Sequence, residues 1–161
     1  MKNMQNTHKT TNYEDLHDAL LTIVGTFNRP QRDELMIKGS GVHLDRALFP
    51  LLVLISRFGP IGVVELADRV GRDYTTVSRQ VAKLEETGLA QRQKNAKDKR
   101  INEAAITTAG KAMTDKIDVT RMQIYDDVFR QWHADERTEL ERLLKKFIAD
   151  FTELERNKKS G

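Results

Sequence analysis

The sequence DYTTVSRQVAKLEETGL, residues Asp73–Leu89, decides the fold that we expect this chain to adopt. In a helix of about 100° per residue, its apolar positions fall on one narrow stripe made of Val77, Val81 and Leu84. Asp73 is a suitable N-cap, and Gly88 can end the helix in the left-handed conformation. The pattern predicts an amphipathic helix over residues 74–87 with one buried side.

The opposite face of this helix combines short hydroxyl side chains with long cations. Its residues are Thr75, Thr76, Ser78, Arg79 and Lys83. Short side chains let the backbone approach a DNA groove, while Arg79 can bind a guanine edge and Lys83 a phosphate. Glu86 also points outward and would repel phosphates, so we expect the N-terminal half of the helix to enter the groove. A solvated amphipathic helix would look the same in isolation, so the flanking segments must decide.

A second short helix is expected immediately before this one. After the stop at Phe58–Gly59–Pro60, an apolar stripe with helical spacing consists of Val63, Leu66, Ala67 and Val70. Gly71–Arg72 then turns the chain into Asp73. Two short helices joined by a tight glycine turn, the second with hydroxyls and cations outward, indicate a helix-turn-helix.

Two further helices are expected upstream. His43–Arg57 is densely apolar and should be the most buried helix; its regular part should begin near Phe49 because of Pro50, with Asp45 capping a preceding turn. The first helix is marked by Leu16, Ala19, Leu20, Ile23, Val24 and Phe27. A polar stretch that ends in a break or turn at residues 39–41 follows it. Residues 1–12 are polar and are expected to form a loose arm.

Beyond Gly88 the helical period is lost, and residues 89–106 predict two short strands around a basic tip at residues 95–100. The cations of this wing are Lys94, Lys97, Lys99 and Arg100, which can straddle a phosphate backbone or enter a minor groove. Asp98 is expected to orient Arg100 and to accept local N–H bonds. The alternative is a solvated turn with ordinary charges.

Two long helices should complete the chain. Thr107 or Thr108 can cap the first and Asp135 the second. The apolar stripe of the last helix is unusually complete and consists of Leu140, Leu143, Leu144, Phe147, Ile148, Phe151 and Leu154. A chain of 161 residues has little with which to cover it. We therefore expect a two-fold dimer that presents two recognition helices about 34 Å apart, with packing inside one chain as the alternative.

The charge distribution and the composition limit the classes of function that this chain can have. Between Arg69 and Arg100, nine Lys or Arg face four Asp or Glu, a local charge of +5 that leaves −2 for the rest of a chain whose net charge is +3. The absence of cysteine excludes disulfides and thiol chemistry. The N-terminus has no signal-peptide core, and the longest apolar run, residues 48–55, is too short to span a bilayer, so a cytoplasmic location is expected.

Other function classes have less support. No glycine-rich phosphate loop or Ser/His/Asp arrangement suggests an enzyme, and no cofactor is expected. The histidines at positions 8, 17, 43 and 133 lack the pairing of a metal site. His17, His43, Arg46 and Arg57 can either face a ligand pocket or be ordinary structural residues. An architectural or protein-interaction module without an effector remains the alternative to a specific regulator.

Together, these elements resemble the MarR family of bacterial winged-helix transcriptional regulators. The match runs over residues 44–110, through LDRALFPLLVLI, GPIGVVELADRVGRDYTTVSRQVAKLEETGL, DKR and ITTAG. The combination of ELA, TTVSR, LEETGL and D-x-R…T-x-x-G at these spacings is highly specific. The resemblance implies a mainly α fold with a small β-hairpin wing, in which N- and C-terminal helices form a two-fold dimerisation region.

This resemblance also assigns roles and boundaries. It implies an N-terminal arm and first dimerisation helix in residues 1–43, a winged helix-turn-helix domain in residues 44–110 and dimerisation helices in residues 111–161. Asp98 and Arg100 would be the wing pair. Most such proteins are repressors that bind a roughly palindromic operator as homodimers and are released by a small, often aromatic or phenolic, ligand. Lys99 stands where a second arginine is frequent and lacks the guanidinium fork.

Overall fold

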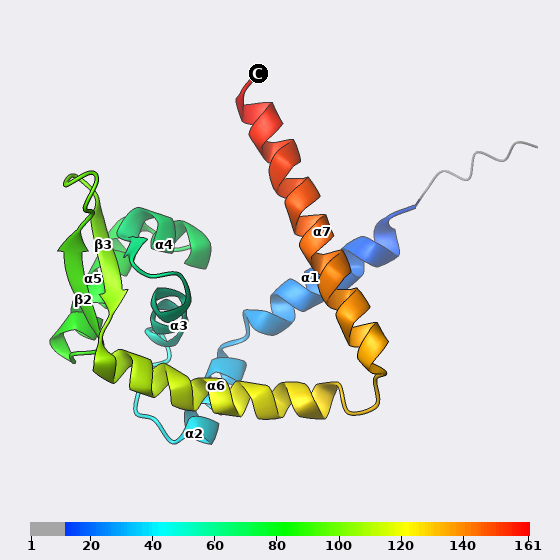
Figure 1. Cartoon of the computed structure of the whole chain (residues 1–161), viewed down its shortest axis with the longest axis horizontal. Helices are drawn as coiled ribbons and strands as arrows, with labels where there is room; N and C mark the ends of the chain where they lie inside the picture. The colour runs from blue at the N-terminus through cyan, green and yellow to red at the C-terminus, as the bar shows by residue number, and fades with distance from the viewer. Residues whose placement is uncertain (1–11) are drawn as a thin grey trace, which may run out of the picture. The chain divides into compact units, whose positions relative to one another are not determined.

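A computed structural model describes residues 12–161 of the chain, so residues 1–11 of the expected arm lie outside the described part. The elements are α1 Glu14–Phe27, α2 Pro30–Ser40, α3 Phe49–Phe58, β1 Ile61–Gly62, α4 Val63–Val70, α5 Tyr74–Glu86, β2 Ala90–Lys94, β3 Asn102–Ile106, α6 Thr108–Val128 and α7 Ala134–Lys159 (Figure 1). The expected class, mainly α with a small β-hairpin, is confirmed. The chain divides into two compact units, one ending at Ile117 and the other beginning at Asp118.

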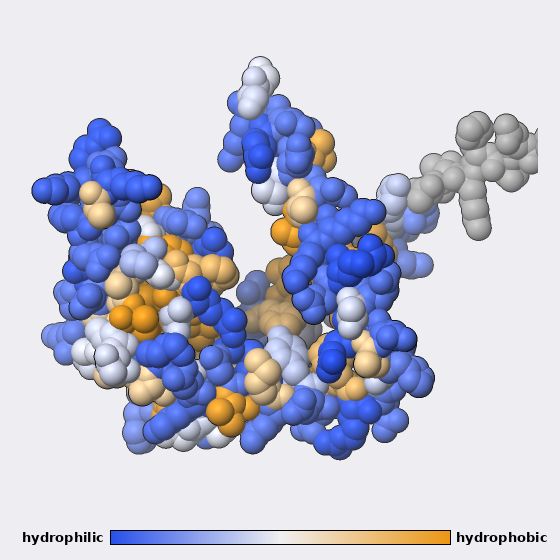
Figure 2. Space-filling model, viewed as in Figure 1, coloured by the Kyte–Doolittle hydropathy of each residue, from blue (hydrophilic) through white to orange (hydrophobic). Residues whose placement is uncertain are grey.

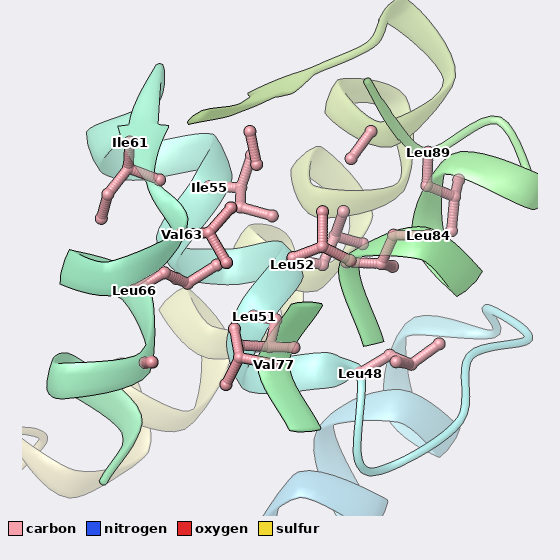
Figure 3. Close-up of a cluster of buried hydrophobic side chains, with 14 residues drawn as sticks. Leu48, Leu51, Leu52, Ile55, Ile61, Val63, Leu66, Val77, Leu84 and Leu89 are labelled. Atoms are coloured by element: carbon pink, nitrogen blue, oxygen red, sulfur yellow. The ribbon is translucent and has the colours of Figure 1, made fainter. Parts of the chain in front are cut away.

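Helix α3 lies at the centre of the first unit, as its dense apolar sequence predicts. Its side chains Leu51, Leu52 and Ile55 are fully buried, and they pack with residues of α4, α5 and the sheet (Figure 3). The regular helix begins at Phe49 next to Pro50. The Asp45 carboxylate caps the preceding turn by accepting a hydrogen bond of 2.8 Å from the Ala47 N–H, as expected.

The predicted helix-turn-helix is formed by α4 and α5. The α5 stripe of Val77, Val81 and Leu84 is fully buried. At its start the Asp73 carboxylate accepts a hydrogen bond of 2.9 Å from the Thr76 N–H, which confirms the predicted cap. Gly71 and Gly88 have φ values of +66° and +77°, so glycine supplies the left-handed residue after each helix.

The expected hairpin pairs β2 with β3, from Ala90 opposite Ile106 to Lys94 opposite Asn102. A third strand was not predicted: β1 is two residues long and pairs antiparallel with β3, with Ile61 opposite Ala104. The strand order is β1-β3-β2. Because β1 is so short, tertiary pairing rather than a local alternation pattern defines it.

Helix α6 begins against the end of α5. The Thr107 hydroxyl oxygen accepts from the Gly110 N–H at 3.0 Å and donates to the Gly88 carbonyl at 2.6 Å, so Thr107 is the cap. A Cβ at residue 110 would collide with the carbonyl of Leu89 and with the Ile106 side chain. The T-x-x-G pattern therefore combines a helix cap with a close backbone approach.

One local prediction is incomplete and another is wrong. The break expected at residues 39–41 is confirmed, because helix α2 ends at Ser40 and Gly41 follows with φ +67°, but the polar stretch before the break is this helix and was not predicted; Pro30 in its first turn favours it. The cap of α7 is His133 rather than Asp135, which lies in the first helical turn. The Glu136 carboxylate accepts a hydrogen bond of 3.0 Å from the His133 N–H, so the helix starts two residues earlier than an Asp135 cap would allow.

The apolar faces of α1 and α7 are exposed in the single chain. Neither helix contains a buried residue. In α7 the whole predicted stripe, from Leu140 to Leu154, is between 36% and 61% exposed. In α1 the exposed apolar residues are Leu16, Leu21, Ile23, Val24 and Phe27. Side chains of this size are rarely left in water along a whole helix face.

Candidate nucleic-acid interface

The outer face of α5 presents three of the predicted DNA-binding residues side by side. Thr75, Arg79 and Lys83 are all exposed, at the i and i+4 spacing that places them on one side of a helix. Within residues 12–161, the side chains of Arg79 and Lys83 form no hydrogen bond or ion pair. Their positive charges are therefore available to a ligand outside the chain.

The other two hydroxyls predicted for this face already bind protein groups. The Thr76 hydroxyl donates to Asp73 at 2.7 Å, and the side chain is half-buried. Hydrogen bonds from the Thr76 N–H and hydroxyl lower the pKa of Asp73 and keep the cap ionised. The Ser78 hydroxyl accepts from Arg92 at 3.0 Å. Thr76 and Ser78 thus fix the helix, while Thr75 remains open.

The predicted wing pair is formed as expected. The Arg100 guanidinium donates two hydrogen bonds of 3.0 Å to the Asp98 carboxylate, which also accepts from the Arg100 N–H at 3.0 Å. These bonds lower the pKa of Asp98 and raise the pKa of Arg100. The Arg100 side chain is 91% exposed, so the carboxylate orients a cation that still projects into solvent.

A buried carboxylate supports the base of the wing. Glu103 of β3 is 7% exposed and accepts hydrogen bonds of 3.0 Å from the side-chain amides of Gln93 and Asn95. The Asn95 side-chain oxygen in turn accepts from the backbone N–H groups of Lys97 and Asp98, both at 2.9 Å. The loop is therefore a hydrogen-bonded turn with a defined conformation.

One of the wing lysines binds a neighbouring side chain of the hairpin, and the other two do not. Lys94 donates to the Asn102 side chain across the hairpin at 2.6 Å. Lys97 and Lys99 are exposed, and their ammonium groups bind no side chain in residues 12–161. The surface over the wing tip is hydrophilic in the view of Figure 2. With Arg100, the two free lysines make the tip a cationic projection beside α5.

Arg92 joins the wing to α5 and was not assigned a role from the sequence. Its guanidinium donates to the carbonyl and hydroxyl of Ser78, and its backbone N–H donates to Glu85 at 2.7 Å. Both partners belong to α5. The local charge count included Arg92, but its partner in the helix is distant in sequence and has no local signal. These hydrogen bonds tie strand β2 of the wing to α5.

A pocket of about 420 Å³ lies where α2 ends and the connection to α3 begins. Its lining residues are Ile37, Lys38, Gly41, Val42, His43 and Leu44. Of the four polar residues considered for a ligand site, His43 is in this lining, whereas Arg46 pairs with Glu34 at 3.1 Å.

Across residues 12–161, no group of His, Cys, Asp or Glu is placed to hold a metal ion. No helix in that range has the length and apolar character to cross a membrane.

The structure has a helix-turn-helix whose apolar side is buried, and its second helix presents cations next to a basic hairpin. This arrangement defines a winged-helix DNA-binding protein. The family model for MarR matches residues 44–102. YxaD of Bacillus subtilis strain 168, described as an uncharacterised HTH-type transcriptional regulator, is 31% identical over 109 residues, which cover 68% of this chain and 76% of YxaD. The chain belongs to the MarR family. It is a DNA-binding transcriptional regulator and not an enzyme.

Solved structures share the fold. The crystal structure of MarR is 22% identical with a TM-score of 0.66, and the alignment covers 85% of this chain and 91% of MarR. A MarR family protein from Bacillus stearothermophilus is 19% identical with a TM-score of 0.68, covering 86% of this chain and 94% of that protein. Because both proteins are less than 25% identical to this chain, the similarity shows a shared fold and nothing further.

Proposed function

We propose that this chain is a ligand-responsive repressor that binds a pseudo-palindromic DNA operator as a homodimer. The observation that carries the sequence-specific part is the outer face of α5, where Thr75, Arg79 and Lys83 are exposed between contacts that fix the helix. A rigid helix with free donors at its N-terminal half suits direct readout of base edges in a major groove.

Each residue of the interface has a distinct part in this proposal. Arg79 reads a guanine edge, Thr75 allows close approach, and Lys83 binds a phosphate. Thr76 and Ser78 hold the backbone of α5 next to the groove through their contacts with Asp73 and Arg92. On the wing, the cations are Lys97, Lys99 and Arg100, with Asp98 orienting Arg100 toward the phosphate backbone or minor groove.

The exposed apolar faces support a homodimer. A second copy can cover the α1 and α7 faces symmetrically, which removes large side chains such as Phe147 and Phe151 from water. A two-fold dimer carries two copies of α5, and helices about 34 Å apart bind successive major grooves on one side of the DNA. The pseudo-palindromic operator follows from this symmetry.

The pocket beside α2 supports a small-molecule effector. It has a volume of about 420 Å³ and is open to solvent, so a ligand bound there would stay partly exposed in the single chain. Apolar side chains from Ile37, Val42 and Leu44 suit an aromatic ring, while Lys38 and His43 suit a phenolic or carboxylic oxygen. A ligand that binds the DNA-free conformation more tightly would release the operator, which is how we propose that repression ends.

Selection from a pool of random-sequence duplexes tests the specific regulator against the architectural alternative. The enriched duplex and a scrambled duplex of equal length are then titrated at about 0.15 M salt. We expect a preference of at least about a thousandfold for the enriched duplex, as is usual for specific regulators. Equal affinities, or a selection that enriches no sequence, would instead support an architectural module that binds DNA through charge alone.

Neutralising the wing tip with Lys97→Gln, Lys99→Gln and Arg100→Gln should weaken binding to the enriched and the scrambled duplex alike. Each phosphate contact contributes about 0.9 to the slope of log affinity against log salt, so three lost contacts flatten it by about 2.7 per protomer. Titrations at several salt concentrations measure this slope.

The matched control removes two lysines and one arginine from the exposed surface of α7. It carries Arg142→Gln, Lys145→Gln and Lys146→Gln and changes the net charge by the same amount. This control should retain the wild-type slope. A wing variant that behaves like the control would show that the wing tip does not contact DNA.

A further inference from the structure

Arg72 lies in the turn between α4 and α5 and contacts three segments. Its backbone N–H donates to the Ala67 carbonyl of α4 at 3.1 Å. Its guanidinium Nη1 donates to the Ala47 carbonyl at 2.8 Å and to the Gln80 side-chain oxygen of α5 at 2.9 Å. The side chain therefore bridges the recognition helix and a residue 25 positions earlier in the chain.

The Ala47 end of this bridge is itself fixed. Ala47 belongs to the connection between α2 and α3, where the Asp45 carboxylate accepts from the Ala47 N–H at 2.8 Å and the Asp45 carbonyl accepts from the Leu48 N–H at 2.9 Å. The neighbouring Arg46 pairs with Glu34 of α2 at 3.1 Å. The carbonyl that binds Arg72 thus lies in an ordered turn tied to α2.

Asp33 of α2 adds charge to this junction. Burial raises the pKa of Asp33, and the positive charges of Arg72 and Arg46 act in the opposite direction. The guanidinium hydrogen bonds of Arg72 run to Ala47 and to Gln80, and the Arg72 charge acts on Asp33 without a hydrogen bond to it. At this place in the fold, one guanidinium nitrogen of Arg72 donates to two acceptors, and the Asp33 carboxyl group feels its charge.

The Gln80 end sets the rotation of α5. In a helix, Gln80 lies beside the buried stripe on one flank, and Ser78 lies on the other flank, where Arg92 holds it. These flank contacts stand on either side of the buried stripe of α5, so a rotation of the helix about its axis would break one of them. The face between them, which carries Arg79, then points outward in one orientation.

We propose that Arg72 is a positioning residue for DNA recognition: by joining Ala47 to Gln80 it fixes the orientation in which α5 presents its outer face. This role rests on the sequence-specific binding proposed above. It does not require Arg72 to touch DNA, because both acceptors of Nη1 are protein groups.

The test compares Arg72→Met, which keeps the stem but removes the donors, with Gln80→Met and with the double variant. The matched control is Arg69→Met, because Arg69 binds Glu65 of its own helix at 3.1 Å and the Phe58 ring at 4.4 Å. Three quantities are measured: the preference for the enriched over the scrambled duplex, the salt slope, and amide hydrogen exchange over residues 74–86.

We expect Arg72→Met to lower the preference about tenfold, because α5 is then no longer held in the orientation in which Arg79 meets the base edge. The double variant should lose no more than Arg72→Met, the salt slope should not change, and exchange in α5 should rise. Arg69→Met should match the wild type. If Arg72→Met does not fold, Gln80→Met alone must lower the preference and raise the exchange.

Two results would overturn the positioning role. One is an unchanged preference together with unchanged exchange in α5. The other is an equal loss on both duplexes with a salt slope lower by about 0.9 per protomer, which would make Arg72 a direct phosphate contact. A wild-type chain that prefers no sequence would overturn the proposed function instead, and exchange in α5 would then decide the role of Arg72.

Discussion

Replacing Arg79 by alanine should lower the preference for the enriched duplex by about fivefold to 150-fold for each recognition helix. The reason is that a bidentate arginine–guanine pair contributes about 1–3 kcal/mol of discrimination against the wrong base. In a dimer both copies of α5 lose the contact, so the effects multiply. Titration of the enriched duplex and of duplexes with single base changes measures the loss.

The pattern of the Arg79→Ala result matters as much as its size. Affinity for scrambled DNA should change little, and the dimer should remain intact, because Arg79 is exposed and binds no side chain within residues 12–161. Lys83→Ala, by comparison, should weaken binding to all sequences and flatten the salt slope by about 0.9 per protomer. An unchanged sequence preference in Arg79→Ala would mean that another face of the chain contacts the bases.

The recognition helix was predictable because its signals are local. The cap residue Asp73, the apolar stripe and the glycine at residue 88 all lie within 17 residues, and the structure forms each of them. The wing pair is similarly local, since Asp98 and Arg100 are two residues apart and close their own turn. Short-range hydrogen bonds of this kind depend little on the rest of the fold.

The contacts that were missed join residues distant in sequence. Arg92 binds Ser78 and Arg72 binds Ala47, separated by 14 and 25 residues. A long arginine side chain can reach many acceptors, and the sequence pattern does not select among them. The same limit applies to β1, which exists because β3 lies next to it. These non-local contacts are the ones that orient α5 and the wing.

Two other misses come from ambiguous local signals. Pro30 suits the first turn of a helix, but the polar residues and Gly39 that follow are also typical of a loop. At α7, His133 and Asp135 are both able to cap, and the Glu136 carboxylate favours His133 by bonding its N–H. Neither miss affects the expected surface, because the apolar stripe of α7 is the same with either start.

Introducing a charge at the middle of that stripe should dissociate the dimer. Phe147 lies at its centre and is 38% exposed in the single chain, with the Phe151 ring 6.0 Å away. Dimerisation buries only the exposed part of Phe147, but Phe147→Glu also places an unpaired carboxylate in the apolar interface; together these effects cost about 1.5–3 kcal/mol or more, and two-fold symmetry applies the loss twice. Phe147→Glu should therefore raise the dimer dissociation constant by about 100-fold to 10,000-fold. Sedimentation velocity over a range of concentrations measures it.

Ala149→Glu is the matched control for this variant. It places the same carboxylate on the same helix, and helical geometry puts residue 149 about 180° from the centre of the stripe. Ala149→Glu should remain dimeric. If Phe147→Glu is equally dimeric at the same concentrations, the α7 face is not the interface, and the alternative of packing inside one chain gains support.

Dissociation of the dimer should also lower its affinity for DNA, in a way that differs from the effect of a change in the recognition helix. Two linked binding modules gain about 10²-fold to 10⁴-fold in affinity because the second contact is intramolecular. Phe147→Glu should lose this factor on the full pseudo-palindromic duplex but bind a single half-site as well as the wild type does. Arg79→Ala should instead lose affinity on the half-site and on the full pseudo-palindromic duplex alike, because each copy of α5 loses its base contact. The two variants thus distinguish a dimer that places two recognition helices from a helix that reads the bases.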